Sequence, residues 1–334
     1  MLTNPKSSAF PWSGVIALVL LLLVIFLPLS ALLSQAQNLD LLTMGQDAYL
    51  WHILQFSLLQ AGLSGLISIF VGFWIARALF RRGQFWGHQW VLGLMGLPLV
   101  IPAIVVVLAM VATFGHQGLF PLGDNLYGLR GILLAHVFFN IPLAVRLLLP
   151  AWQGISAHYW QLGLELNFSS WDYFRHLEWP SLKGHIPRVF LLIFLLCFTS
   201  FAVVLGLGGG PQSATLEVAI YEALRFELDF AKGAVLALVQ LFITGILAFW
   251  LVQWPQSQEQ RHSGQLTLSP LRGWTDYPWI LFAATLVLLP LGLLFADLFQ
   301  QDLWQILGQD ALVKASLTSI SLALTAAAFA LIWG

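Results

Sequence analysis

The sequence has few charged residues and almost no cysteine. Asp, Glu, Lys and Arg make up 9% of its 334 residues, whereas they make up about a quarter of an ordinary soluble domain. The formal net charge of −1 argues against a nucleic-acid-binding protein, which needs a surplus of Lys and Arg. Cys197 is the only cysteine, which excludes an intrachain disulfide and a zinc site built from cysteines.

Motifs of enzymes and nucleotide-binding proteins are also missing. The sequence contains no HExxH, no GxSxG and no Walker A motif, so we predict no catalytic residues and no cofactor held by this chain. The glycines between Leu205 and Pro211 are not followed by the GK[ST] of a phosphate loop, and we predict a flexible break before a short helix at 213–224. An intramembrane enzyme would need a buried acid or an acid–histidine pair. Asp172 and His176 are four residues apart, but capping or solvation explains them more simply.

Long apolar runs, in contrast, are abundant. Hydrophobic residues make up 59% of the chain, and about 20 apolar helical residues cross the ~30 Å core of a bilayer. The runs predict an all-α transmembrane bundle with spans at 14–33, 53–80, 91–114, 131–149, 186–207, 233–254 and 278–295, and an eighth that begins after Lys314. We interpret the first span as an uncleaved anchor, because it is long and lacks a clear small-residue cleavage site.

Lys and Arg are distributed unevenly between the predicted loops. With a cytoplasmic N-terminus, ten of the 14 basic residues fall on the cytoplasmic side, as the positive-inside rule requires. The inner set is Lys6, Arg77, Arg81, Arg82, Arg146, Arg175, Lys183, Arg188, Arg261 and Arg272, and the outer set is Arg130, Arg225, Lys232 and Lys314. A cytoplasmic N-terminus is therefore predicted.

One cytoplasmic segment, Gln161 to Pro187, interrupts the apolar pattern with short amphipathic helices. The first of these helices begins before Gln161, with Ser156 as its expected N-cap. It ends at Asn167, a residue that tolerates left-handed backbone. Its predicted apolar face consists of Ile155, Tyr159, Leu162 and Leu166. Spacing alone leaves two interpretations equal: a projection that fits a partner's groove, or a loop packed under its own bundle.

The second helix follows at once. Ser169 and Asp172 have the spacing of a capping box. Trp171, Phe174 and Leu177 form its predicted apolar stripe. We expect this helix to end at Pro180, since proline disfavours helix in the residue before it.

The spacing of this loop resembles the cytoplasmic signature of permeases in binding-protein-dependent ABC importers, EAA, three residues, G, nine residues, I, one residue and LP. In the order of that pattern this chain has Gln161, Leu162, Gly163, Asn167, Leu177, Trp179 and Pro180. Spacing is kept throughout, whereas identity survives only at Pro180. Asparagine is the mildest replacement for the family's glycine.

Other runs resemble the permeases of bacterial thiamine and thiamine pyrophosphate importers. They are DAYLWHILQFSLLQAGLSGLISIF, GILLAHVFFNIPLAVRLLL, WDYFRHLEWP and FTSFAVVLGLGGGPQSATLEVAIYEAL. The resemblance implies the type I importer permease fold in the bacterial inner membrane, separate ATP-binding cassette ATPase subunits that bind ATP and Mg, and a periplasmic solute-binding protein. It implies thiamine or its phosphates as cargo, with ferric iron or another small solute as the alternative. A secondary transporter is disfavoured, because the spans show no coupling carboxylate.

Permeases of this group resemble two fused six-helix halves. Here Ser57–Leu63 and Ser316–Leu322 each open a span at corresponding places, as a repeat requires. We expect a first half at 1–254 with its ATPase-coupling loop at 151–185, a cytoplasmic linker at 255–277, and a truncated start of the second half at 278–334. Without a second coupling loop, this chain alone is not expected to transport.

Two further pairs of residues are candidates for the transport path and for docking. His136 and Asn140 share one helical face and could line the path, although interhelical hydrogen bonding is favoured about two to one. Glu217 and Glu222 could receive a basic patch of a binding protein, whereas a solvated acidic face is the more common explanation.

Overall fold

The computed structural model describes residues 12–36, 47–83, 85–254, 273–299 and 309–333, and these are all helix, turn or loop. The helices are α1 (Trp12–Ala36), α3 (Ala48–Arg82), α4 (His88–Leu94), η1 (Leu97–Leu99), α5 (Ala103–Phe114), η2 (Gly123–Leu126), α6 (Leu129–Gln153), α7 (Ala157–Glu165), α8 (Ser170–Tyr173), η3 (Phe174–Glu178), α9 (Trp179–Leu182), α10 (Ile186–Phe198), α11 (Ala202–Leu207), η4 (Pro211–Ser213), α12 (Leu216–Glu222), η5 (Ala223–Glu227), α13 (Phe230–Gln253), α14 (Asp276–Phe299) and α16 (Asp310–Trp333). The all-α prediction is confirmed.

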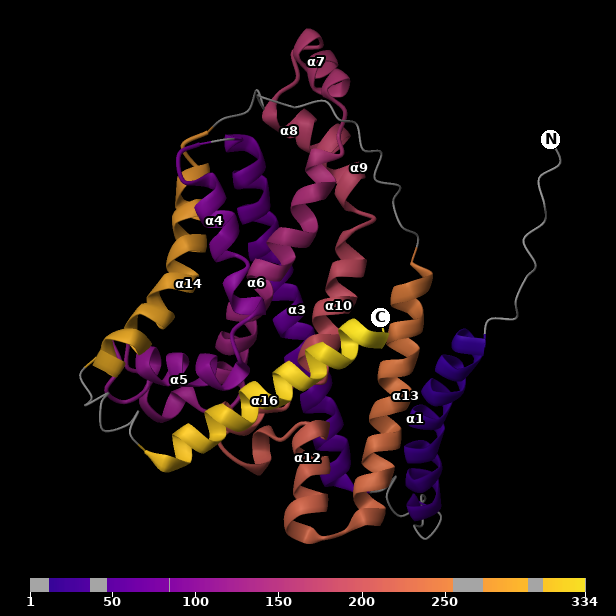
Figure 1. Cartoon of the computed structure of the whole chain (residues 1–334). Helices are drawn as coiled ribbons and strands as arrows, with labels where there is room; N and C mark the ends of the chain where they lie inside the picture. The colour runs from indigo at the N-terminus through magenta and orange to yellow at the C-terminus, as the bar shows by residue number, and fades with distance from the viewer. Residues whose placement is uncertain (1–11, 37–46, 84, 255–272, 300–308, 334) are drawn as a thin grey trace, which may run out of the picture.

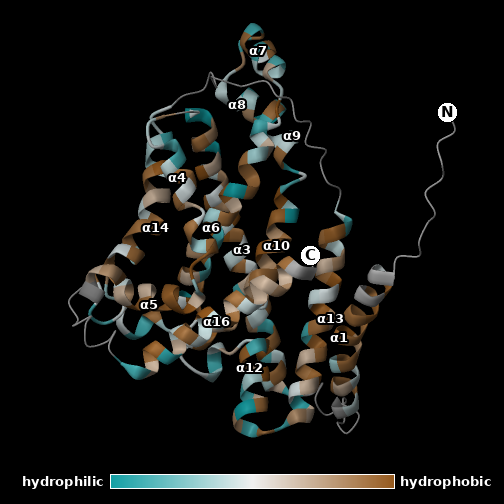
Figure 2. Ribbon diagram, viewed as in Figure 1, coloured by the Kyte–Doolittle hydropathy of each residue, from teal (hydrophilic) through white to brown (hydrophobic). Residues whose placement is uncertain are grey.

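The longest helix, α3, is the centre of the bundle. It packs against α6, α10 and α14 (Figure 1). Small residues recur on its buried face, including Ala61, Gly65, Ser68 and Gly72. In a bilayer, where lipid is as apolar as leucine, close backbone approach across such small residues drives helix association. Many large apolar side chains are exposed on the surface of the bundle, and Figure 2 shows that α1 and α13 consist mostly of hydrophobic residues.

Five of the described helices are long and apolar enough to cross a membrane, or up to seven spans if each of two bent pairs counts as one. The chain is therefore a multi-pass membrane protein. α1, at the first predicted span, packs along α13 at the edge of the bundle (Figure 1).

Two predicted spans are not single straight helices. The span predicted at 91–114 is broken between α4 and α5, because the segment His88–Leu99 is bent by 109° relative to α5. Pro98 and Pro102 lie between α4 and α5, and proline removes a backbone donor and disfavours helix in the preceding residue. The span predicted at 186–207 ends as α10 at Phe198, and α11 begins separately at Ala202. A run of apolar residues indicates that a segment lies in lipid, but it does not indicate where the helix bends or breaks.

The two ends of α3 contact different parts of the chain. At its N-terminal end, His52 Nε2 lies 2.9 Å from the backbone carbonyl of Gln212, close to α12. At its C-terminal end, Arg77 pairs with Glu178, beside α7 to α9 (Figure 1). Arg77, with the loop of α7 to α9, thus lies at the opposite end of the bundle from α12, as the distribution of basic residues predicts.

Gly72 lies where α3 and α6 approach each other closely, and it provides a test of this packing. A Cβ at Gly72 would lie 2.7 Å from Ala144 Cβ, whereas a Cβ at Gly62 would meet nothing within 4 Å. We expect Gly72→Ala to lower the free energy of unfolding in detergent by about 1–3 kcal/mol through overpacking. Gly62→Ala is the matched control and should be neutral or slightly stabilising. Equal unfolding midpoints for the two variants would contradict this interface.

Candidate functional site

The first part of the interrupted loop folds as predicted. Ser156 caps α7, since its Oγ accepts a hydrogen bond from the His158 amide at 3.4 Å. Asn167 follows the helix with φ 52°, which is the left-handed conformation expected of an Asn in the family's glycine position. The turn between the two helices is therefore tight without a glycine.

The capping box of the second helix is also confirmed. Ser169 Oγ accepts from the Asp172 amide at 3.3 Å, and the Asp172 carboxylate accepts from the Ser169 amide at 3.0 Å. These reciprocal bonds fix the chain direction where α8 begins.

The prediction that the second helix ends at Pro180 is wrong. α8, the π-turn η3 and α9 follow one another without a gap from Ser170 to Leu182. Pro180 lies in the first turn of α9, where a missing N–H is tolerated. The π-turn lets the helix continue, because it changes the hydrogen-bond register just before the proline.

The predicted apolar face of α7 lies mostly on the outside of the protein, as the interpretation of this loop as a projection requires. Ile155 is buried, but Tyr159, Leu162 and Leu166 are between 41% and 59% exposed. The face that packs inward carries Trp160 and Gly163 instead. Helical spacing identifies an apolar stripe, but it does not say whether the stripe faces the protein's own core or solvent.

The inward face of α7 is held by Tyr173. The Tyr173 ring stacks on Trp160 with ring centroids 5.4 Å apart, and its hydroxyl donates to the Trp160 carbonyl at 3.2 Å. A Cβ on Gly163 would lie 2.5 Å from the Tyr173 ring, so a residue with a side chain does not fit there without a shift. These contacts join α7 to α8 in one compact unit, residues 157–182, which we term the knob.

The knob presents an apolar surface outward. Its exposed large apolar side chains are Tyr159, Leu162, Leu164, Leu166, Trp171 and Trp179. A hollow of about 330 Å³ is lined by Trp171, Phe174, Arg175 and Trp179. Of the other loop positions predicted to act, Gln161, Asn167 and Pro180 are exposed, and Leu177 packs partly against the core.

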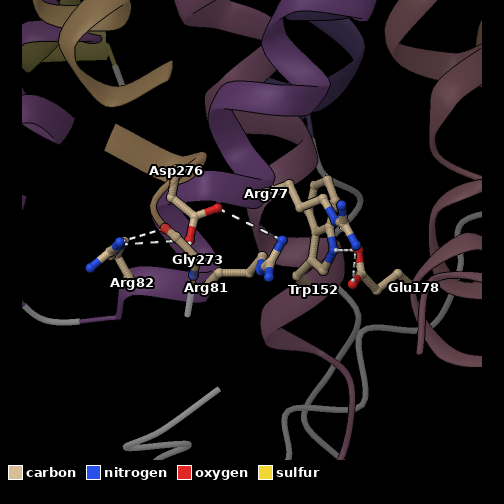
Figure 3. A network of polar contacts seen from close by, with 7 residues as sticks. All are labelled: Arg77, Arg81, Arg82, Trp152, Glu178, Gly273 and Asp276. Atoms are coloured by element: carbon tan, nitrogen blue, oxygen red, sulfur yellow. Dashed lines mark hydrogen bonds and ion pairs between the residues drawn. The ribbon is translucent and has the colours of Figure 1, made fainter. Parts of the chain in front are cut away.

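An ion pair that the sequence analysis missed fixes the knob to the bundle. Glu178 is fully buried, and its carboxylate accepts two hydrogen bonds from the Arg77 guanidinium, at 2.6 and 2.9 Å. Trp152 Nε1–H donates to the same carboxylate at 3.2 Å (Figure 3). The Arg77 guanidinium also lies 5.4 Å from the centre of the Phe174 ring. A buried carboxylate must be paired, and here three helices contribute to its pairing.

A second ionic cluster lies beside the first. Asp276, at the start of α14, lies 3.7 Å from Arg81 and 3.6 Å from Arg82 (Figure 3). Arg82 also donates to the Gly273 carbonyl, and its guanidinium stacks 3.8 Å above the Tyr277 ring. Sequence analysis counted Arg77, Arg81 and Arg82 only as cytoplasmic charges. The sequence did contain a signal for these pairs. The arginines stand near the end of one apolar run, and each acid stands shortly before a later apolar run.

His136 and Asn140 lie buried between three helices. His136 Nδ1 is 3.3 Å from Ser64 Oγ on α3, and Asn140 Nδ2–H donates to Cys197 Sγ on α10 at 3.1 Å. Both residues therefore take part in contacts between helices, the role that sequence analysis favoured. Their place in a transport path stays a prediction.

The acids of the opposite end of the bundle are partly engaged. Gln240 Nε2–H donates to Glu217 at 2.5 Å, and Glu222 is half-buried. α12 follows Gly209 and Gly210, both with positive φ. The chain therefore breaks before a short helix, which covers Leu216–Glu222 instead of the predicted 213–224, and the flexibility of this break stays a prediction. Among the described residues, no group of three or more His, Cys, Asp or Glu side chains could hold a metal ion.

Breaking the Arg77–Glu178 pair should destabilise the protein. We expect Arg77→Leu and Glu178→Leu each to lower the free energy of unfolding by about 3–5 kcal/mol, because each leaves one buried charge unpaired. The double variant should lose much less than the sum. Denaturant unfolding in detergent measures the cycle, with the exposed Glu165→Gln as control; additive losses would refute the coupling.

The left-handed turn at Asn167 should accept only certain residues. Asn167→Gly should leave the thermal unfolding midpoint close to that of the starting protein, whereas Asn167→Val should cost about 1–2 kcal/mol, because a β-branched side chain is strained at positive φ. Limited proteolysis between α7 and α8 should detect the same difference. Equal behaviour of the two variants would show that the turn is not left-handed.

No family model matches the sequence. The chain is 40% identical over 333 residues to the thiamine transport system permease protein ThiP of Escherichia coli (strain K12), in an alignment that covers 94% of this chain and 61% of the relative. With ThiP of Haemophilus influenzae it is 40% identical over 79% of this chain and 50% of the relative. The chain thus spans about three fifths or less of these relatives. It is also 28% identical, over 55% of its length and 71% of the relative, to a probable sulfate transport system permease protein of Chlorella vulgaris.

Two solved structures share the fold. One is a bacterial alginate ABC transporter in complex with an alginate pentasaccharide-bound periplasmic protein, with a TM-score of 0.60 and 13% identity over 72% of this chain and 91% of the other. The second is a bacterial ABC transporter involved in alginate import, with a TM-score of 0.57 and 15% identity over 73% of this chain and 96% of the other. The chain is thus similar in sequence to thiamine transport system permease proteins over most of its own length, and it shares the fold of the two alginate ABC transporter structures.

Proposed function

We propose that the chain is part of the membrane-spanning subunit of an ATP-driven ABC importer that moves thiamine or its phosphates into the cytoplasm. The observation that carries the importer class is the knob, an exposed aromatic surface clamped to the end of the central helix by a buried ion pair. The cargo rests on similarity to thiamine transport permeases, at 40% identity over 94% of this chain.

The knob binds a separate ATPase subunit in this proposal. The residues at the family's signature positions are Gln161, Leu162, Gly163, Asn167, Leu177, Trp179 and Pro180. Exposed tryptophans dominate many protein interfaces, and burial of Trp171 and Trp179 in a cleft of the partner would remove their apolar area from water. ATP and Mg would be bound by that partner, so this chain supplies attachment and movement instead of nucleotide chemistry.

Movement of the ATPase subunits would reach the membrane through the knob. Glu178 is buried and accepts two hydrogen bonds from Arg77. A displacement of the knob would therefore pull on α3, because the knob cannot move independently of that helix. α3 packs along α6 and α10, so a tilt of α3 would rock the bundle and open the path alternately to the two sides.

The proposed orientation places the N-terminus and the knob in the cytoplasm of a bacterium, with the bundle in the inner membrane. α7 to α9 lie at the opposite end of the bundle from α12 (Figure 1), and Arg77 pairs with Glu178 beside them; this distribution of basic residues supports the orientation. A periplasmic binding protein would then dock near α12, where Glu217 and Glu222 lie. Residues 1–254 would form the first half of the permease, 255–277 the linker and 278–334 the start of the second half.

The test is uptake of labelled thiamine by vesicles that hold the complete permease, its ATPase and its binding protein. We expect ATP-dependent, saturable uptake that thiamine pyrophosphate inhibits and ferric iron does not. Inhibition by ferric iron and not by thiamine pyrophosphate would support the importer part of the proposal and would contradict thiamine as the cargo.

The knob is tested in the same vesicles. Trp171→Ser with Trp179→Ser should weaken ATPase association at least about tenfold and abolish uptake. Trp250→Ser, on an exposed tryptophan of α13, is the matched control and should keep both. Undiminished ATPase binding and uptake in the knob variant would contradict the proposal.

A further inference from the structure

The last turns of α3 hold two ionic contacts that face different partners. Arg77 binds Glu178 of the knob at 2.6 Å, and Arg81 and Arg82 lie 3.7 and 3.6 Å from Asp276 of α14. Five residues of helix separate Arg77 from Arg82, a rise of about 7.5 Å. Both contacts are therefore attached to one short, rigid stretch of a single helix (Figure 3).

Asp276 is built into this junction. It is only 3% exposed, and it also accepts the Gly273 amide at 3.1 Å, which orients the start of α14. Beside it, Trp74 of α3 stacks on Trp279 of α14 with ring centroids 6.1 Å apart. Without the carboxylate, two neighbouring guanidinium groups would repel each other in a partly buried place.

We propose that Asp276 is a positioning residue that passes movement of the knob to α14. The path runs from Glu178 to Arg77, along the end of α3, and from Arg81 and Arg82 to Asp276. The inference rests on the proposed function, because the knob moves only if an ATPase subunit pulls on it. It adds that α14, which is separated from α13 in the chain by residues 254–275, responds to the knob through side-chain contacts instead of through the chain that connects α13 to α14.

The alternative is that Asp276 only caps and stabilises α14. The two roles make different predictions, because loss of a cap lowers stability whereas loss of a link lowers transport per ATP hydrolysed. A coupling free energy of ordinary size corresponds to a change of fivefold or more.

The complete importer, with permease, ATPase and binding protein in vesicles, provides the first measurement. We expect Asp276→Asn to keep ATPase association and ATP hydrolysis but to lower labelled thiamine imported per ATP by about fivefold or more. Asp276→Glu should restore the ratio, because it restores the charge. Asp310→Asn, on an exposed acid in the first turn of α16, is the matched control. If Asp276→Asn does not fold, Arg82→Gln carries the same expectation.

The second measurement follows α14 directly and does not depend on the cargo. Spin labels at Phe242→Cys and Leu281→Cys occupy exposed positions of α13 and α14, and the native Cys197 is 1% exposed and shielded from labelling. ATP with Mg should change the distance between the labels, and Asp276→Asn should abolish that change while Asp310→Asn keeps it.

The outcomes separate this inference from the proposed function. Unchanged transport per ATP and an unchanged ATP-dependent distance in Asp276→Asn would overturn the link and leave the importer intact. A starting protein that fails to bind the ATPase would overturn the proposed function and the link together. A starting protein that binds the ATPase and shows the distance change without thiamine uptake would overturn only the cargo, and the loss of that change in Asp276→Asn would still support the link.

Discussion

The buried Glu178 carboxylate is the constraint on which the arrangement of this protein depends. A fully buried charge is tolerated only when it is paired and hydrogen-bonded, so Glu178 must stay against Arg77 and Trp152. This requirement fixes the position of the knob, since Glu178 is the last residue of η3, which is part of the knob. It also brings Phe174 beneath the Arg77 guanidinium. The aromatic hollow of the knob is thus a consequence of the same pairing that anchors it.

The end of α3 concentrates charge in a chain that otherwise has little. Arg77, Arg81 and Arg82 lie within six residues, and each faces a carboxylate from a distant part of the sequence. Aromatic rings flank the guanidinium groups, and arginine suits such places because its planar group binds carboxylates and stacks on rings. The rest of α3 is joined to its neighbours by small residues and by sparse hydrogen bonds such as that from Gln60 to the Cys197 carbonyl. The ion pairs of α3 are thus confined to one end of the helix, whereas close packing joins the rest of it to α6 and α10.

Similarity and geometry support different parts of the functional proposal. Identity of 40% over 94% of the chain shows similarity to thiamine transport permeases, and it is the basis for the proposal of thiamine as cargo. The fold shared with the alginate transporters says nothing about cargo, because folds host many functions. The knob and the Arg77–Glu178 pair are observed in the described residues, and they are the geometric basis for the proposed attachment of an ATPase subunit.

The sequence by itself determined the membrane class, most of the helices and the local chemistry of the loop. Ser156, Asn167 and the Ser169–Asp172 box act as predicted, because caps and left-handed turns depend on residues close in the chain. Tertiary structure alone decided which face of α7 is exposed, how α4 and α5 bend apart, and that helix continues through Pro180. It alone paired Arg77 with Glu178, and Asp276 with Arg81 and Arg82. Partners separated by 101 residues, or by nearly 200, meet only when helices pack, and no local pattern records which helices become neighbours.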